Sequence, residues 1–181
     1  MALTRRKFIG NIACASIAAQ VGSFQTASAS IALGGTQIDV VSDGSLTLPG
    51  SFIFDPMPKD ELAPILDKYN QSADQLTPPC NVTLLQDDDR TVLFDAGAGA
   101  GFMPSAGALS DSLDAVGVAP EEITHVVFTH CHPDHLWGVL DEFDDVMFPD
   151  ATYMMGTIEW DYWRDPATVD AIDPARAAFA V

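Results

Sequence analysis

The stretch Thr129-His130-Cys131-His132-Pro133-Asp134-His135 carries the most distinctive chemistry in the chain. Three of the four histidines lie in it, together with one carboxylate. Imidazole nitrogen and carboxylate oxygen are ligands that suit zinc or a similar divalent metal ion. Apart from His125, the preceding residues 124–128 are β-branched or apolar, which predicts a short buried strand. We therefore expect the histidines at the carboxyl end of a strand, where α/β folds build their sites.

The spacing within this stretch predicts that its ligand side chains form two pairs. His130 and His132 are two positions apart, so in an extended backbone they point to the same side and can grip one ion. Pro133 ends the extended run and fits the first turn of a following helix. Asp134 and His135 are adjacent and diverge from the first pair, which places them to serve a second ion. Four ligand-type side chains directly after an apolar strand disfavour the alternative that all are solvated loop residues.

The order of these residues resembles the His-Xaa-His-Xaa-Asp-His signature of the metallo-β-lactamase superfamily. The resemblance implies that His130 and His132 bind one zinc ion and that Asp134 and His135 bind a second, with a hydroxide between the two ions in the intact protein. Asp134 would also orient that hydroxide, so it is the predicted catalytic residue. The resemblance further implies that Asp95 supports the metal-binding loop by hydrogen bonds rather than as a ligand, because it ends a strand and precedes a small residue and a glycine.

The hydrophobic pattern predicts a mixed α/β domain. Two hairpins are expected, one with strands 37–41 and 45–48 around Ser42-Asp43-Gly44, the other with strands 81–85 and 91–94. Further apolar patterns predict one strand and four helices, the strand at 151–155 and the helices at 60–69, 106–116, 157–163 and 173–181.

In the resembled family, this order of elements forms the first half of an αββα sandwich. The resemblance covers roughly residues 37–164, and no histidine follows His135. The family's full pattern has a further histidine, a bridging aspartate and a last histidine downstream. We therefore expect residues 30–181 to be the N-terminal half of such a domain, a truncated sandwich. Alone it would be inactive, with two ligands per ion where a catalytic zinc usually has three plus water.

The N-terminus has the order of parts that an export signal needs. Thr4-Arg5-Arg6-Lys7-Phe8-Ile9 matches the twin-arginine pattern, a weakly apolar segment follows, and Ala27-Ser28-Ala29 is a small-residue cleavage site. Residues 1–29 are thus predicted to be a twin-arginine signal peptide that directs the protein to the periplasm. The segment is too short and too polar to span a bilayer stably. An ordinary amphipathic N-terminal helix is the alternative.

The charge balance narrows the class of partner. The chain has 26 acidic residues against 8 lysines and arginines. So acidic a chain is a poor candidate for nucleic acid or an anionic membrane surface, and a neutral or cationic small-molecule substrate fits better. For most of these charges we favour the alternative that the acidity only keeps the protein soluble. The sequence leaves a homodimer as an open alternative.

Several side chains near the predicted site allow two interpretations. Phe52 and Phe54 either form a flap over the site or cover a sheet edge. Trp137, which stands where the family usually has the first of two glycines, either shapes a substrate pocket or fills core. Cys80 and Cys131 are expected to be separate thiols rather than a disulfide framework, with Cys131 pointing away from the metal ions.

The function that these residues predict is a metal-dependent hydrolase. The pattern looks most like the methyl parathion hydrolase and N-acyl homoserine lactonase branch, so an ester, a lactone or a phosphotriester is the implied substrate, and a β-lactam is less favoured. A metal-bound hydroxide would be the nucleophile. Two alternatives stay open: a mononuclear iron oxidoreductase that resembles persulfide dioxygenases, and a non-catalytic remnant.

Overall fold

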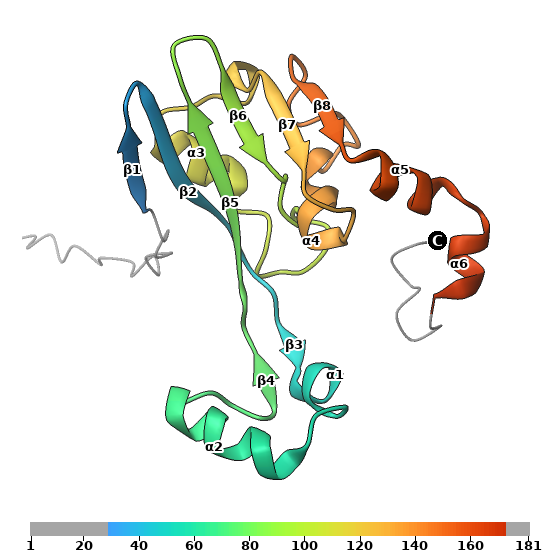
Figure 1. Cartoon of the computed structure of the whole chain (residues 1–181). Helices are drawn as coiled ribbons and strands as arrows, with labels where there is room; N and C mark the ends of the chain where they lie inside the picture. Colours follow the sequence, from blue (N-terminus) through green and yellow to red (C-terminus); the bar gives the residue numbers. More distant parts are fainter. Residues whose placement is uncertain (1–28, 173–181) are drawn as a thin grey trace, which may run out of the picture.

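A mixed, six-stranded sheet forms the body of the protein. The computed structural model describes residues 29–172; apart from Ala29, the predicted signal peptide (1–29) lies outside this range, as does the predicted helix at 173–181. The strand order is β1-β2-β5-β6-β7-β8 (Figure 1), with the bounds β1 Ser30–Leu33, β2 Thr36–Ser45, β5 Pro79–Gln86, β6 Thr91–Phe94, β7 His125–Phe128 and β8 Thr152–Met155. The first four strands pair antiparallel, and β6, β7 and β8 run parallel. The expected α/β class is confirmed.

The predicted hairpin around Ser42-Asp43-Gly44 is wrong. Strand β2 continues through these residues as far as Ser45, with an irregularity in its pairing to β5. The hairpin that does form joins β1 to β2 across Gly34 and Gly35, where Gly34 has a positive φ of 63°. The second predicted hairpin is confirmed, because β5 and β6 pair antiparallel across a turn at 87–90.

A small arm projects from one end of the sheet. It contains the two-stranded pair β3 (Leu48–Pro49) and β4 (Gln75–Leu76) with the helices α1 (Gly50–Phe54) and α2 (Lys59–Tyr69), and it hangs below the sheet in Figure 1. Helix α2 confirms the predicted helix at 60–69, and the short helix α1 holds Phe52 and Phe54. Because α1 packs on β3 and β4, Phe52 and Phe54 do not cover an edge of the main sheet.

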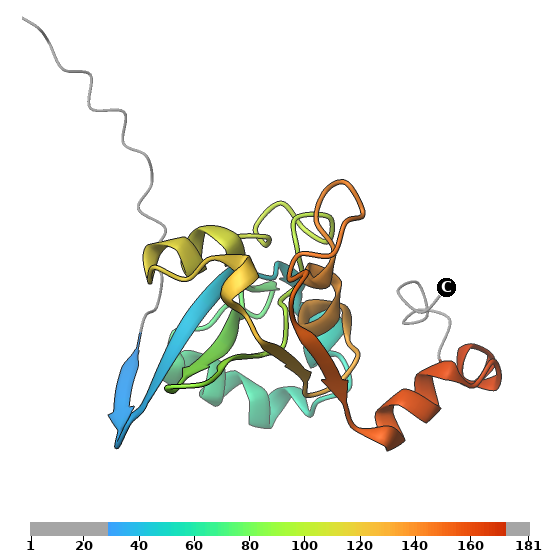
Figure 2. The ribbon, with the colours of Figure 1, turned by 90° about the horizontal axis from the view of Figure 1, so that it is seen from above.

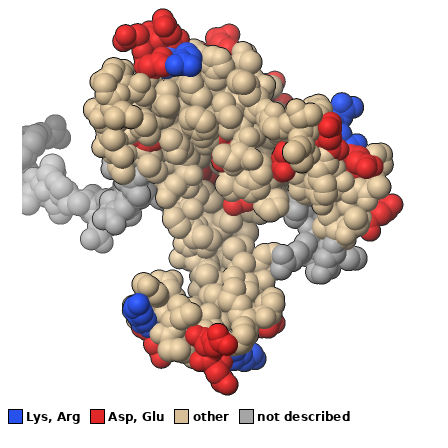
Figure 3. All heavy atoms as spheres, viewed as in Figure 1, with Lys and Arg blue, Asp and Glu red and all other residues tan. Residues whose placement is uncertain are grey.

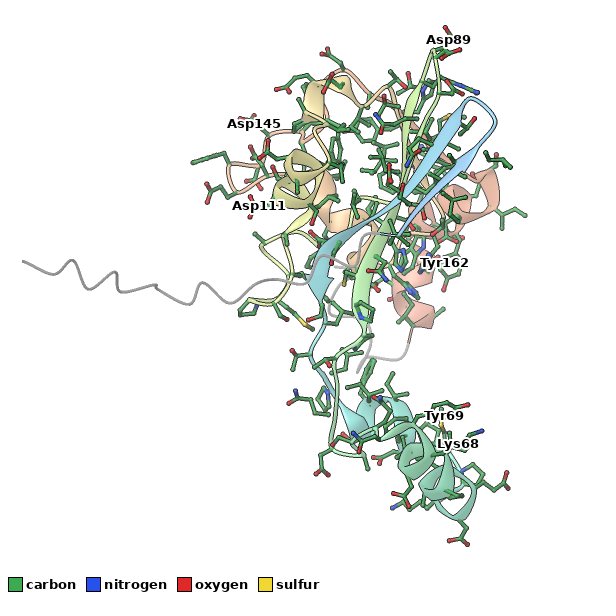
Figure 4. All side chains as sticks on the ribbon, turned by 90° about the vertical axis from the view of Figure 1, so that its left-hand side faces the viewer. Lys68, Tyr69, Asp89, Asp111, Asp145 and Tyr162 are labelled. Atoms are coloured by element: carbon green, nitrogen blue, oxygen red, sulfur yellow. The ribbon has the colours of Figure 1, made fainter. Side chains whose placement is uncertain are left out.

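Helix α3 (Leu109–Ala115) covers one face of the sheet. In Figure 2 it lies on one side of the strands, and in Figure 4 Asp111 of α3 and Tyr162 of α5 (Thr157–Arg164) lie on opposite sides. The remaining short helices are η2 (Pro120–Glu122), α4 (Pro133–Leu136), η3 (Trp137–Val139) and α6 (Ala167–Ala171). Gly117, with a φ of +77°, follows the C-cap of α3, a position that favours glycine.

The core lies between α3 and the sheet. Register brings Leu84, Leu93 and Val126 side by side on β5, β6 and β7, and all three are fully buried against this face. The other face carries partly buried apolar side chains such as Leu85 and Val127. Figure 3 shows this face almost without charge, while acidic side chains gather at the turns, on the arm and over α5 and α6. A sandwich places its second sheet on such a face.

The helices within residues 29–172 include none with the length and apolar character that crossing a membrane requires.

The central position of Leu93 yields a prediction of stability. Leu93→Ala should lower the free energy of unfolding by about 2–5 kcal/mol, because a fully buried leucine leaves a cavity. The matched change Leu33→Ala, at a side chain that is 70% exposed, should alter it by less than about 0.5 kcal/mol. Urea unfolding followed by circular dichroism measures both; equal losses would contradict the placement of the core.

Candidate metal centre

The histidine loop, residues 129–135, runs from the end of strand β7 (His125–Phe128) into helix α4 (Pro133–Leu136). His132 has extended backbone, with φ −71° and ψ 153°, and stands at the N-cap of α4. Pro133 is the first residue of that helix and is buried. The change from extended chain to helix at Pro133 is the one that the sequence predicts. The loop therefore begins as a continuation of the strand and ends as the first turn of a helix.

The four predicted ligands lie close together. The ring centroids of His130 and His132 are 4.6 Å apart, and those of His130 and His135 are 4.0 Å apart. Oδ2 of Asp134 lies 3.4 Å from Nε2 of His135. The fold thus gathers three imidazoles and one carboxylate at the carboxyl end of β7.

The donor spacing fits metal binding in pairs. Two ligands at about 2.0–2.1 Å from a tetrahedral zinc ion are about 3.4 Å apart. This is the separation of the Asp134 and His135 donor atoms. Within residues 29–172, however, no three side chains among His, Cys, Asp and Glu are arranged to hold a single ion. The loop therefore offers one ligand pair at this spacing, Asp134 with His135, and the assignment of the two ligand pairs to two ions stays a prediction.

Asp95 fixes the histidine loop from the side of β6. Its carboxylate accepts hydrogen bonds from the backbone N–H of Thr129 at 2.7 Å and from the Thr129 hydroxyl at 2.8 Å. Oδ2 also lies 2.8 Å from Nδ1 of His135, which leaves Nε2 turned toward Asp134. The supporting role predicted for Asp95 is confirmed as a set of contacts, of the kind that orients metal-binding histidines.

Charge in the cluster is concentrated on His135. Hydrogen bonds first to Asp134 and then to Asp95 raise the pKa of its imidazole to about 9. The same contact with His135 lowers the pKa of Asp134. Burial would raise the pKa of Asp95, but hydrogen bonds from His135 and Thr129 outweigh it and lower the pKa. Burial, followed by the charges of His135 and His132, lowers the pKa of His130. Without a metal ion, the carboxylates thus hold a proton on His135.

Asp43 is a structural acid that the sequence did not reveal. Its side chain is 1% exposed, and it accepts hydrogen bonds from the backbone N–H groups of Ala98, Gly99 and Leu109 at 2.7, 3.1 and 3.0 Å. Burial raises its pKa, although these hydrogen bonds partly offset the effect. A Cβ at Gly97 would lie 2.5 Å from the Asp43 carboxyl carbon. Asp43 thereby shapes the glycine-rich segment that begins at Asp95.

The side chains around the loop resolve two of the open interpretations. Trp137 is 41% exposed, packs edge-on against Phe102 at 5.3 Å, and lines a cleft of about 960 Å³ beside the glycine-rich segment. It therefore forms part of a cleft wall and does not fill core. Cys80 and Cys131 are free thiols, and Sγ of Cys131 contacts Sδ of Met155 at 3.3 Å.

Part of the chain matches a family model, and the fold is similar to that of solved structures. Residues 77–162 match the family model described as the metallo-beta-lactamase superfamily. The fold is similar to the structure of AidC, a dizinc quorum-quenching lactonase in complex with a product, with a TM-score of 0.70 and 26% identity over 84% of this chain. It is also similar to AbOPH, a hydrolase in the beta lactamase superfamily, with a TM-score of 0.73 and 26% identity over 84% of this chain.

A third structure shares the fold alone. A probable metal-dependent hydrolase from Staphylococcus aureus is 23% identical over 75% of this chain, with a TM-score of 0.62. The chain spans 57% of the length of AidC, and 52% of the length of each of the other two structures. The comparison with curated proteins gave no significant match.

The ion pairs of His135 predict a pH dependence in the metal-free protein. The ordinary histidine pKa is about 6.5, and the folded value is raised to about 9. The stability that these pairs contribute should be fully present below pH about 6.5 and lost as the pH rises through about 9.

Titration of His135 by NMR after chelation of metal, together with melting temperatures over the same pH range, measures this effect. In Asp95→Asn the His135 pKa should fall toward its ordinary value, because one of two carboxylate partners is gone. An unshifted His135 in the wild-type chain would contradict the arrangement.

Proposed function

We propose that the protein is a metal-dependent hydrolase of the metallo-β-lactamase superfamily that acts at the histidine loop. The observation that carries this proposal is the gathering of His130, His132, Asp134 and His135 at the end of β7. The hydrolases of similar fold support it, and one of them is a dizinc lactonase.

The donor set fits two zinc ions. His130 and His132 would hold one ion, and Asp134 and His135 the other. Bound there, zinc would lower the pKa of a water molecule toward neutrality and polarise the carbonyl or phosphoryl oxygen of the substrate. Nε2 of His135 faces Asp134 because Asp95 holds Nδ1. This bond also fixes the ring orientation that a ligand needs.

Asp134 has a second task in this proposal. Its pKa is lowered by His135, so the carboxylate is ionised at neutral pH. An ionised carboxylate can accept a hydrogen bond from the attacking water and orient it toward the substrate. The proposed substrates are esters, lactones or phosphotriesters. A lactone is supported by the similar structure that was solved with a lactonase product.

The reaction would take place in the periplasm. The predicted signal peptide at residues 1–29 would deliver the enzyme to the periplasm. There it would meet small-molecule substrates, whereas the excess of acidic residues disfavours nucleic acid as a partner. A homodimer fits the proposal as well as a monomer does.

Loss of one ligand tests the proposal. In the full-length protein, His132→Ala should remove most bound metal and lower kcat/KM by more than about 100-fold, since loss of an outer-shell partner alone costs about 10–100-fold. His125→Ala is the matched control, because His125 lies in β7 and bonds to Thr124 instead. Elemental analysis and assays with a lactone, an ester and a phosphotriester supply the measurements.

Two results would count against the proposal. Unchanged zinc content and rate in His132→Ala would reject the ligand assignment. One iron per wild-type chain with uptake of oxygen would replace the hydrolase with an oxidoreductase.

A further inference from the structure

We propose that Glu159 is a positioning residue that holds the backbone of the histidine loop on the side opposite Asp95. The inference rests on the proposed function, because it assigns Glu159 a task at the same metal centre. Glu159 lies in the first turn of α5, outside the predicted set of site residues.

The contacts of Glu159 are short and specific. Its Oε1 accepts the backbone N–H of Cys131 at 2.8 Å and the indole N–H of Trp163 at 2.7 Å. The peptide groups of Cys131 lie between the candidate ligands His130 and His132, so the direction of that amide sets the relative orientation of the two histidines. A hydrogen bond to an ionised carboxylate is about twice as strong as a neutral one. Glu159 is therefore placed to fix the ligand pair of the first ion.

Sheet topology gives the loop two supports. Strand β7 lies between β6 and β8. Asp95 directly follows β6 and accepts the N–H of Thr129, while Glu159 follows β8 and accepts the N–H of Cys131. The backbone that leaves β7 is thus held by one carboxylate from the segment that follows each neighbouring strand. Asp95 also holds His135, so the two carboxylates serve different ligand pairs.

Trp163 connects Glu159 to the imidazole of His132. Its ring meets that of His132 edge to face, with centroids 6.3 Å apart and planes at 77°. Because Glu159 fixes the indole nitrogen, it restrains the rotation of His132 through this contact. The pKa of Glu159 is lowered, first by the N–H of Cys131, so the carboxylate stays ionised at neutral pH.

A purely local role is the competing explanation. An acidic side chain in the first turn of a helix stabilises the helix dipole without any contact to another segment. That role would change the stability of α5 and leave the histidine loop as it is. The test must therefore measure the order of the loop backbone and the affinity for metal, rather than the stability of the helix.

The experiment compares three variants of the full-length protein, Glu159→Ala, Glu159→Gln and Glu121→Ala. Glu121 is the control, because it is an exposed glutamate of η2, which precedes β7, whereas the loop follows β7. In the metal-free protein, hydrogen exchange of the Cys131 amide should be about tenfold or more faster in Glu159→Ala. Titration with zinc should show binding weakened by about 10–100-fold at one of the two sites.

The other two variants should behave differently. Glu159→Gln keeps an acceptor oxygen for the Cys131 N–H, so it should recover most of the affinity. Glu121→Ala should match the wild type in both measurements.

Each outcome decides between the explanations. Wild-type exchange and wild-type zinc affinity in Glu159→Ala would overturn the inference, and so would equal losses in Glu159→Ala and Glu121→Ala. If the wild-type chain bound no zinc, the proposed function would fail, while faster exchange in Glu159→Ala would still establish the hold on the loop.

Discussion

The carboxylate of Asp95 is the constraint on which the arrangement of the histidine loop depends. After β7 the chain leaves the sheet, so the N–H of Thr129 has no strand partner, and Asp95 accepts it together with the Thr129 hydroxyl and Nδ1 of His135. Asp95 itself has a φ of +70°, a conformation that a non-glycine residue rarely adopts. One side chain thereby ties the end of β6 to both ends of the histidine loop.

This constraint has its own support. The segment after Asp95 turns back through Gly97 and Gly99, both with positive φ, and the buried carboxylate of Asp43 accepts the N–H groups of this turn. A larger residue at Gly97 would collide with Asp43. An unpaired buried carboxylate would be costly, so Asp43 and the glycine-rich segment stabilise each other. Two buried acids, Asp43 and Asp95, thus fix the backbone that positions the histidines.

The sequence predicts individual strands and helices more readily than the long-range contacts between them. The strands 124–128 and 151–155 and the helices 60–69 and 157–163 follow from local apolar patterns, and β7, β8, α2 and α5 confirm them. The predicted turn at Ser42-Asp43-Gly44 is wrong. These residues have the composition of a turn, but the Asp43 carboxylate accepts hydrogen bonds from backbone N–H groups 55 to 66 residues away. No local pattern announces such a bond. The only hint is an acid that shares a strand face with Val41.

The same distinction applies to the site. His130, His132, Asp134 and His135 are consecutive enough for their spacing to predict the cluster, and Asp95 was found through the family resemblance. Glu159 could not be found in this way, because it lies among aromatic residues of a helix and its role depends on how α5 meets the loop. Where no family pattern marks them, residues that support a site from a distance in the chain are visible only once the fold is known.

The central claim is that the loop after β7 holds two metal ions in separate ligand pairs. Anomalous diffraction from crystals of the full-length protein grown with zinc tests it most directly. The account predicts two peaks about 3.5–4 Å apart, one beside His130 and His132 and the other beside Asp134 and His135. Crystals without anomalous density at this loop, or with density only at a site elsewhere, would contradict it.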